Sequence, residues 1–390
     1  MKQSQSMIVV QEMMTEFAEL TGLSSTAHPP RRYLWTDSFA VCNLLWLYRM
    51  TADKRYRDLA LKLVDQVHHI LGRHREDDKR RGWISGLSET DGELHPTAGG
   101  LRIGKEMNER RPSDRFDERV EWDRDGQYYH YLTKWMHALN RVSRVTGEHV
   151  YNTWAIELAK AVHRRFTYMP QYGSQKRMFW KMSIDLSRPL VESMGHHDPL
   201  DGFITYSQLQ ASLQEYQGRS KDADLAAEIA DMAAICKGKD WVTDDPLGLG
   251  ELLSSAYKIA RLNSDGVVID SGLMDLLLDS AAPGLNSYVK EGAVKLPAEY
   301  RLAFRELGLS IGLHAVERLR ELRKDDRRAS GRGEIQYNRI KPLERFLPLG
   351  ETIENFWLDP GNRESAAWTE HRDINIVMLA TSLGPDGYLG

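Results

Sequence analysis

Apolar residues recur along the chain with the spacing of amphipathic helices, and one such segment occurs twice. When the sequence is shifted by 95 residues, from position 44 to position 139, matching residues of 44–68 coincide with those of 139–163. In both copies one helix ends near a threonine (Thr51, Thr146), a polar turn follows and a second helix begins. Apolar residues of the second helix lie three and four positions apart, which places them on one face. The pattern predicts a repeated helical hairpin, with a weaker third copy around 225–236.

The two helices of each predicted hairpin differ in character. First helices such as 39–48, 128–139 and 249–259 are apolar or aromatic around most of their circumference, which predicts burial on more than one side. A buried helix followed by a half-exposed one indicates two helical layers, and no alternating run of β-branched residues indicates a sheet. The expected pairs are 38–50 with 54–72, 126–145 with 149–167, 203–217 with 221–237, 248–261 with 267–281, 299–313 with 314–324, and 351–357 with 371–383. Six such pairs, closed on themselves, form an (α/α)6 barrel.

The turn between the helices resembles the hairpin pattern of the six-hairpin glycosidase superfamily. The residues that carry this resemblance read Thr-Gly-Glu-x-x-Tyr-x-x-x-Ala over 146–155 and are echoed over 51–60. The resemblance covers most of residues 31–383 and implies an all-α fold, the (α/α)6 barrel. It is an architectural signature, and a fold of this kind implies no single activity.

We expect a single domain over residues 1–390, with an N-terminal extension at 1–30 and two long loops. Residues 76–120 form an irregular stretch that is dense in arginine, aspartate and glutamate and is interrupted by glycines. Loops of this length inside a compact domain usually serve a function. Apolar residues within this loop can pack against other parts of the domain. We therefore expect an ordered cap over one mouth of the barrel. The Lys-, Arg- and Gly-rich residues 322–341 predict a mobile surface loop.

Acidic residues, histidines and tryptophans precede the predicted inner helices. In an (α/α)6 barrel these helices run parallel, so their N-terminal ends meet at one mouth and surround one pocket. Indole rings stack on the apolar faces of sugars, so the combination favours a carbohydrate ligand. The expected substrate-binding residues are Trp35, Asp37, Trp122, Gln127, His130, His197, Asp198, Trp241, Asp245, Trp368, His371 and Asp373. The alternative is structural, because an aspartate before a helix caps its free N–H groups and tryptophans also fill cores.

Paired carboxylates suggest glycoside hydrolysis. That reaction needs one carboxyl group to protonate the leaving oxygen and another to attack the sugar or activate water. Asp123 with Asp125, and Asp198 with Asp201, place like charges close together, which raises the pKa of one member. In the unsaturated glucuronyl hydrolases of the superfamily, key aspartates lie at inner-helix starts, and Asp125 and Asp201 are similarly placed. The expected catalytic residues are Asp125, Asp201, Asp123 and His196.

Histidines offer a second chemistry. Sugar 2-epimerases share the barrel and use rim histidines as acid and base; the candidates here are His130, His196, His197 and His371. The run from His196 to Asp198 is a poor metal site, because adjacent residues do not easily ligate one ion, and we expect no metal. A non-catalytic, toroid-shaped binding protein is the third hypothesis.

Gln127, His130 and Lys134 share one face of the predicted helix 126–145. If this face looks toward the barrel axis, it forms a polar wall of the pocket. If it looks sideways, the aromatic residues on the same helix belong to the core. The sequence leaves both arrangements open.

Residues 99–105 match the first part of a phosphate-binding loop, but Glu106 stands where serine or threonine must hold Mg²⁺, and no strand precedes them. We therefore expect no nucleotide and no cofactor. Arg102 and Lys105 remain candidates for contact with an acidic group of a ligand beneath the cap.

The composition of the chain limits the classes of binding partner that we expect. The 390 residues include 52 Lys and Arg against 56 Asp and Glu, a formal net charge of −4, so no basic field favours nucleic acid or an anionic membrane. The longest apolar stretch, about ten residues, is too short to span a bilayer. Two cysteines, Cys42 and Cys236, cannot form a disulfide framework, and the N-terminus does not resemble a signal peptide, so we expect a cytoplasmic protein. The expected partner is a small-molecule or oligosaccharide substrate. The sequence does not indicate an oligomeric state.

Overall fold

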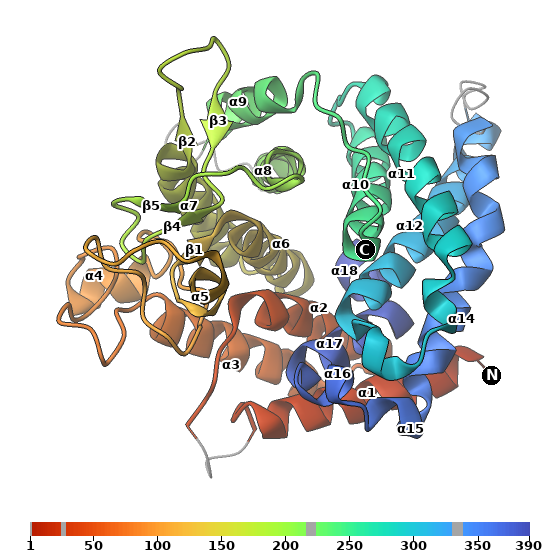
Figure 1. The fold of residues 1–390 in the computed structure, drawn as a ribbon, viewed down its shortest axis with the longest axis horizontal. Helices are drawn as coiled ribbons and strands as arrows, with labels where there is room; N and C mark the ends of the chain where they lie inside the picture. The colour runs from red at the N-terminus through yellow and green to blue at the C-terminus, as the bar shows by residue number, and fades with distance from the viewer. Residues whose placement is uncertain (1, 25–28, 216–223, 330–337) are drawn as a thin grey trace. The chain divides into compact units, whose positions relative to one another are not determined.

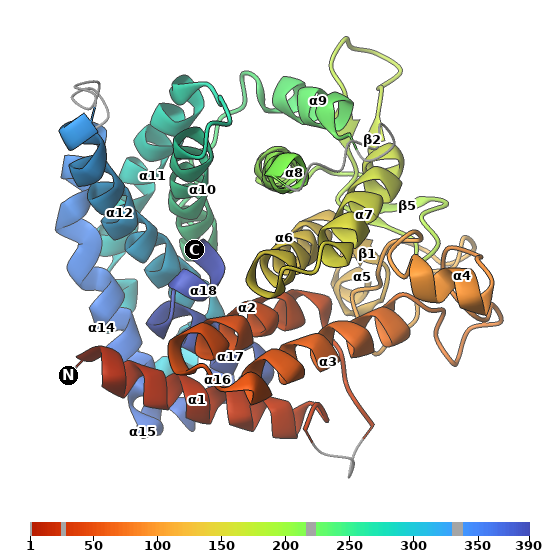
Figure 2. The same cartoon turned by 180° about the vertical axis from the view of Figure 1, so that it is seen from behind.

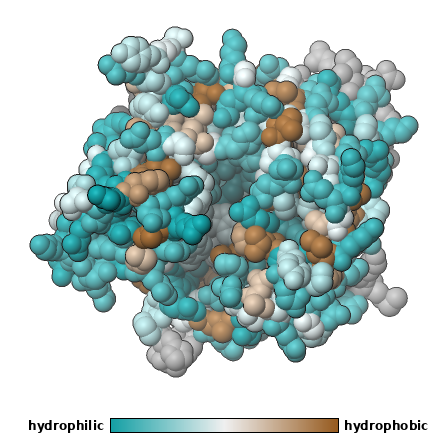
Figure 3. All heavy atoms as spheres, viewed as in Figure 1, coloured by the Kyte–Doolittle hydropathy of each residue, from teal (hydrophilic) through white to brown (hydrophobic). Residues whose placement is uncertain are grey.

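The computed structural model describes residues 2–24, 29–215, 224–329 and 338–390. Contacts divide the chain into two compact units. Unit 1 comprises Met1–Phe17 and Lys239–Gly390, and unit 2 comprises Ala18–Gly238. That the chain forms a single domain stays a prediction. In Figure 3, hydrophilic side chains cover most of the face in view, with apolar residues scattered among them. None of the described helices combines the length and apolar character needed to cross a membrane.

Unit 2 is built from three helical hairpins in two layers (Figure 1). In each hairpin the first helix belongs to an inner layer and the second to an outer layer. The inner helices are α2 (Leu34–Thr51), α6 (Tyr129–Thr146) and α8 (Asp198–Glu215), and the outer helices are α3 (Lys54–Leu71), α7 (Val150–Phe166) and α9 (Ala226–Cys236). Within the inner layer α6 packs against both α2 and α8. These are the first three predicted hairpins, although α8 begins five residues earlier than expected, at 198 instead of 203.

The repeat in the sequence has a local structural cause at the turn between the helices of a hairpin. The hydroxyl of Thr51 donates to the carbonyl of Leu47 at 2.7 Å. In the second copy the hydroxyl of Thr146 donates to the carbonyl of Val142 at 2.8 Å. The same hydroxyl then accepts the N–H two residues on, at 3.2 Å in each copy. The residue between adopts a left-handed conformation, with φ of +57° at Ala52 and +78° at Gly147. The threonine thus ends one helix and starts the turn to the next.

Burial follows the predicted pattern. Every residue of α2 from 34 to 47 is buried, whereas α3 buries one face, including Ala60, Leu63, Val64 and Val67. Figure 2 shows α2 and α3 side by side, and α6 beside α7. A helix buried on all sides needs apolar residues around its circumference, and a half-exposed helix needs only a stripe.

Unit 1 is also helical. Its longer helices are α10 (Pro246–Ser264), α11 (Ser271–Glu291), α12 (Ala303–Ala329), α14 (Leu347–Leu358) and α17 (Arg372–Leu383). Helix α10 packs against α11 and α12, and α12 packs against α14 and α17. Short helices α15 (Pro360–Arg363), α16 (Ala366–Thr369) and α18 (Asp386–Leu389) and 3-10 turns at Ala293–Lys295, Ala298–Tyr300 and Lys341–Phe346 complete the unit. The expected N-terminal extension contains helix α1 (Lys2–Leu20), most of which belongs to unit 1.

Two predictions for this part of the chain are wrong. The pair 299–313 with 314–324 is a single helix, α12, which also includes residues 322–329 of the predicted surface loop. Residues 330–337 of that loop lie outside the described residues, and 338–341 are helical. Gly308 and Gly312 lie within α12 where it packs closely on α10: a Cβ on Gly308 would contact Leu247, and a Cβ on Gly312 would contact Gly250. A Cβ on Gly250 would lie 2.0 Å from the carbonyl oxygen of Gly308.

Residues 76–120 of unit 2 contain two short helices, α4 (Glu89–Leu94) and α5 (Glu118–Asp123). We call residues 76–120 the cap segment. The N–H of Ile103 donates to Gly126 and its carbonyl accepts from Leu34, so the cap segment lies against the starts of the first two inner helices. Short antiparallel strands follow: β1 (Gln127–Tyr128) pairs with β4 (Lys181–Met182), which pairs with β5 (Pro189–Val191), and β2 (Thr167–Tyr168) pairs with β3 (Arg177–Met178). Strands of two or three residues carry no alternating pattern, so the sequence did not indicate them.

Candidate functional site

Side chains at the starts of α2, α6 and α8 meet at one end of unit 2. The hydroxyls of Tyr33, just before α2, and Tyr131 on α6 lie 2.7 Å apart. On the other side of α6, Lys134 Nζ donates to Asp201 Oδ2 of α8 at 3.1 Å, and His130 Nδ1 lies 3.6 Å from Asp198 Oδ1. Contacts between side chains therefore link the three inner-helix starts, and His130 and Lys134 face α8.

Aromatic rings line this cluster. Tyr128 packs against both Tyr131 and Trp180, with ring centroids 5.3 and 6.0 Å away. The indole N–H of Trp180 donates to His130 Nδ1 at 3.4 Å. Trp122 meets Trp180 edge to face at 4.9 Å, and 44% of its surface is exposed. Exposed and half-buried rings beside ionisable groups form a surface suited to the apolar face and the hydroxyl groups of a sugar.

The tyrosines of the cluster act as neutral hydrogen-bonding groups. Burial raises the pKa of Tyr33 to about 12, and burial also raises the pKa of Tyr128. Lys105 of the cap segment lies with its ammonium group 5.5 Å from the centre of the Tyr33 ring, and burial lowers the pKa of this lysine. The cap segment thus places a cation next to the aromatic cluster, and contact of Lys105 with an acidic group of a ligand stays a prediction.

Asp125 lies within a buried network that ties down the cap segment. Its side chain has no exposed surface. Oδ2 accepts from Arg102 at 2.5 Å and lies 3.4 Å from Arg75. Oδ1 accepts from the N–H groups of Gly104 and Gly126, each at 3.0 Å. Both oxygens are occupied, and this network accounts for the position of Asp125 without any substrate.

Gln127 also holds the cap segment through hydrogen bonds of its side chain. Its amide accepts from the N–H of Leu101 at 3.0 Å and donates to the carbonyls of Gly99 and Ile184 at 3.1 and 2.6 Å. Gly100 has φ of +79°, and a Cβ there would lie 2.0 Å from the Gln127 side chain. The residues that resemble a phosphate loop therefore wrap around Gln127 and Asp125. Of the three residues expected on one face of this helix, His130 and Lys134 contact α8, whereas Gln127 contacts the cap segment.

Some of the remaining predicted residues of unit 2 are buried and hold the local structure, and the others lie at or near the surface. Asp37 is buried, accepts the N–H of Tyr33 at 2.9 Å and lies 3.4 Å from Arg32, so it holds the start of α2. Trp35 is buried next to Tyr131, with centroids 6.5 Å apart. Asp123 is exposed at the end of α5. His196 is exposed and His197 is half-buried, with ring centroids 4.7 Å apart, just before α8.

Five predicted residues belong to unit 1. Trp241 is fully buried, and Trp368 is buried and stacked on Trp357 at 5.6 Å, so both are core residues. Asp245 caps α10 by accepting the N–H of Gly248 at 3.0 Å. His371 precedes α17 and packs against Phe304, and Asp373 lies in the first turn of α17. That all the predicted residues face one pocket stays a prediction.

The sequence analysis missed Trp180, Tyr33 and the role of Tyr131. Tyr33 could have been found by the same rule as Asp37, because it directly precedes an inner helix. Trp180 had no such signal, since it reaches His130 only through the pairing of β1 with β4, in which Tyr128 lies opposite Lys181. Among the residues that the structure describes, no three His, Cys, Asp or Glu side chains gather as a metal site would require.

Comparison with known proteins identifies the fold. No family model and no curated protein sequence matches the chain. The structure is similar to that of a GH76 alpha-mannanase from Bacteroides thetaiotaomicron, with a TM-score of 0.54 over 97% of this chain and 96% of that one. The chain has the fold of the six-hairpin glycosidase superfamily. The predicted fold class, an all-α (α/α)6 barrel, is confirmed.

The sequence identity to the mannanase is only 8%, so the likeness extends to the fold alone. A cellobiose 2-epimerase from Spirochaeta thermophila is similar at a TM-score of 0.48 and 11% identity, over 95% of this chain and 97% of that one. A cellobiose 2-epimerase from Bacillus thermoamylovorans is similar at 0.47 and 12%, over 89% and 87%.

Proposed function

We propose that the chain is a carbohydrate-active enzyme and that its site is the cluster at the starts of α2, α6 and α8. The observation that carries the proposal is the combination of ionisable groups with aromatic rings. His130, Lys134, Asp198 and Asp201 lie in contact on two neighbouring inner helices, next to Trp180 and the exposed Trp122. Acid–base groups move protons, and the rings bind the apolar face of a sugar.

Glycoside hydrolysis is the reaction we propose first. Lys134 stabilises a negative charge on Asp201, as expected of a carboxylate that attacks the sugar or activates water. Asp198, beside His130, is the proposed proton donor. Asp125 has no part in this version, because two arginines and two backbone N–H groups occupy its oxygens. The similar structure is named an alpha-mannanase, so α-mannosides are the first substrates to test.

Sugar epimerisation is the second candidate, and His130 favours it. An imidazole that lies 3.6 Å from a carboxylate and accepts a hydrogen bond from an indole is held in one orientation. Such a group can take a proton from a sugar carbon on one face, while a second acid delivers a proton to the other face. His196, His197 and His371 remain predicted partners for this role.

One experiment distinguishes the two reactions. The protein is incubated in D₂O with α-mannan oligosaccharides and with mono- and disaccharides, and the products are followed by NMR. Hydrolysis produces new reducing ends without deuterium at C2, whereas epimerisation introduces deuterium at C2 without shortening the chain.

Variants locate the reaction within the cluster. Asp201→Asn should lower the rate of hydrolysis by about 10²–10⁴, the usual value of a general acid or base, and His130→Ala should do so for epimerisation. Asp270→Asn is the control, because Asp270 caps α11 from an exposed position. Full activity in Asp201→Asn, Asp198→Asn and His130→Ala would contradict the site. Absence of both turnover and binding across the sugars would contradict the function.

A further inference from the structure

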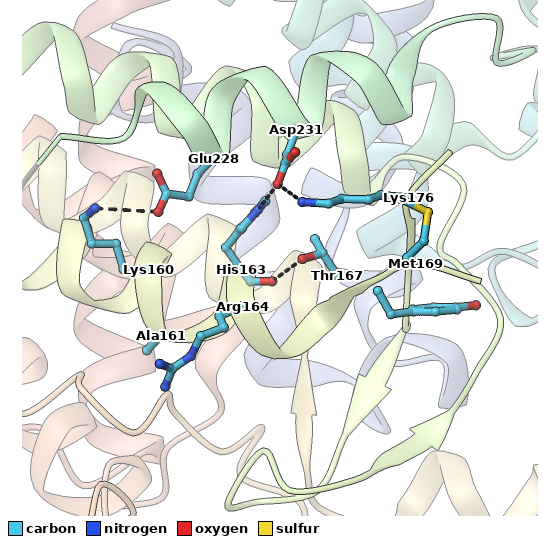
Figure 4. Close-up of a pocket in the computed structure, with 10 residues that line it drawn as sticks. Lys160, Ala161, His163, Arg164, Thr167, Met169, Lys176, Glu228 and Asp231 are labelled. Carbon is cyan, nitrogen blue, oxygen red and sulfur yellow. Dashed lines mark hydrogen bonds and ion pairs between the residues drawn. The ribbon is translucent and has the colours of Figure 1, made fainter. Parts of the chain in front are cut away.

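A second pocket lies in the outer layer of unit 2, between α7, the β2–β3 hairpin and α9 (Figure 4). Its volume is about 640 Å³, within the range of about 300–1,000 Å³ that small-molecule sites occupy. The lining residues are Lys160, Ala161, His163, Arg164, Thr167, Tyr168, Met169, Lys176, Glu228 and Asp231. None of them belongs to the cluster described above. We call this the outer pocket.

Charged side chains from both helices face the outer pocket. Asp231 Oδ2 accepts from Lys176 at 2.5 Å and lies 3.1 Å from His163 Nε2, and Lys160 lies 3.6 Å from Glu228. Each carboxylate therefore already has a lysine beside it. Arg164 is exposed and forms no hydrogen bond or ion pair with any residue that the structure describes. The outer pocket thus retains one guanidinium group that an anionic ligand can use.

Two buried acceptor atoms next to the outer pocket have no hydrogen-bond donor among the described residues: His163 Nδ1 and Glu228 Oε2. Burial lowers the pKa of His163, so its ring is neutral, and with Nε2 donating to Asp231 the other nitrogen is an acceptor. A buried acceptor without a donor is unfavourable. His163 and Glu228 both line the outer pocket, and hydroxyl groups of a ligand bound there would be donors for these atoms.

An aromatic ring completes the outer pocket. Tyr168 stacks on Phe179 with centroids 4.2 Å apart and an angle of 11° between the planes. Phe179 does not line the outer pocket, so it supports Tyr168 from behind. A tyrosine backed in this way is a rigid surface for the apolar face of a sugar ring.

We propose that the outer pocket binds a monosaccharide that carries an anionic group, either a phosphate or a carboxylate. Arg164 binds the anionic group through its planar pair of N–H donors, Tyr168 contacts the sugar ring, and Glu228 with His163 accepts hydrogen bonds from ring hydroxyls. The site is independent of the proposed reaction, since it shares no residue with the cluster at the inner-helix starts.

Isothermal titration calorimetry with four probes tests the proposal: glucose 6-phosphate, glucuronate, glucose and inorganic phosphate. We expect the better of the two anionic sugars to bind at least about tenfold more tightly than both glucose and phosphate, since a charge-assisted hydrogen bond is worth roughly 1.5–3 kcal/mol. Which of the two binds more tightly identifies the anionic group.

Matched variants locate the binding. Arg164→Ala should abolish the advantage of the anionic sugar over glucose, whereas Arg165→Ala, its exposed neighbour outside the lining, should not. Tyr168→Ala should weaken binding about tenfold, whereas Tyr172→Ala, on the exposed tip of the same hairpin, should not. Asp201→Asn should leave binding unchanged.

Three outcomes would overturn the proposal. Phosphate that binds as tightly as glucose 6-phosphate would show a site for anions without sugar recognition. Equal losses in Arg164→Ala and Arg165→Ala would show a diffuse charge effect. Loss of binding in Asp201→Asn, or no saturable binding by a correctly folded protein, would show that the outer pocket takes no such ligand. None of these outcomes bears on turnover at the cluster.

Discussion

His314 of unit 1 lies between two carboxylates. Its Nε2 is 2.7 Å from Glu354 and its Nδ1 is 3.0 Å from Glu317. Burial opposes a charge on this ring, but the hydrogen bonds to Glu317 and Glu354 outweigh burial and raise the pKa of His314 to about 9. The imidazolium connects α12, which carries His314 and Glu317, with Glu354 of α14.

This raised pKa predicts a dependence of stability on pH. Because the folded pKa exceeds the unfolded value of about 6.5, the stabilisation is fully present below about pH 6.5 and is lost as the pH rises through 9. We expect the free energy of unfolding to fall by roughly 3 kcal/mol over this window. Urea unfolding at pH 6, 7.5 and 9 measures it. His314→Asn should flatten the curve, and a variant with the same slope as the wild type would contradict the assignment.

Asp125 allows a test of structural against catalytic roles. Removing one partner of a buried ion pair leaves uncompensated charges, so Asp125→Asn should lower the free energy of unfolding by about 3 kcal/mol. Asp123→Asn, two residues away and exposed, should change it by less than about 0.5 kcal/mol. Urea unfolding and proteolysis within residues 76–120 provide the measurements. An Asp125→Asn protein of normal stability that has lost turnover would instead support the catalytic role expected from the sequence.

At the scale of elements, the repeated turn contains one unfavourable residue. Ala52 ends α2 with φ of +57°, a conformation that glycine adopts without strain, and the matching residue of the second copy is Gly147. Ala52→Gly should therefore stabilise the protein by about 0.5–1 kcal/mol. Gly147→Ala is the reciprocal change, and it should destabilise by about 1 kcal/mol through φ alone, since no atom lies within 4 Å of a Cβ at this site. Thermal unfolding measures both. Destabilisation by Ala52→Gly, or stabilisation by Gly147→Ala, would show that the backbone conformation does not govern the stability of the turn.

Equivalent positions of the sequence repeat also make contacts between neighbouring hairpins. His68 of α3 and His163 of α7 occupy the same position of the repeat, and each contacts the following hairpin. His68 accepts a hydrogen bond from Trp135 of α6 at 3.2 Å, and burial lowers its pKa to about 3; His163 contacts Asp231 of α9. One sequence position therefore serves a core contact in one copy and lines the outer pocket in the other.

At the scale of the molecule, unit 1 is assembled from two distant segments, 1–17 and 239–390, while unit 2 is continuous. Helix α1 runs through residue 17 into unit 2 without interruption. A unit whose segments are separated by more than half of the chain closes a long loop when it folds, which costs conformational entropy. When unit 2 unfolds, unit 1 alone bears this entropic cost, so we expect both units to unfold in a single transition.

Coincident urea transitions, by far-UV circular dichroism and by tryptophan fluorescence, would support this single transition. Two separate transitions, or a fragment 18–238 that unfolds at the same urea concentration as the whole chain, would contradict it and would also contradict the prediction of a single domain.

The sequence by itself determined the helical hairpins of unit 2 and their two layers. Helical periodicity and burial are local properties: α2 is apolar around its circumference and α3 along one stripe, so their spacing alone distinguishes them. The close approach of α12 to α10 at Gly308 and Gly312 had no signal in the local pattern. An aspartate before a helix was ambiguous, since Asp37 and Asp245 hold helix starts while Asp201 contacts Lys134.

Only the tertiary structure decided which of these side chains lie in contact. Arg75 and Arg102 reach Asp125 from 50 and 23 residues away, a contact that is absent from any local pattern, so Asp125 holds the cap segment whether or not it is catalytic. Trp180 joins His130 across 50 residues through a two-residue strand that has no periodic signal. Local spacing specifies which face of a helix is apolar, whereas the partner of a polar group is chosen by chain segments that meet only when the hairpins pack.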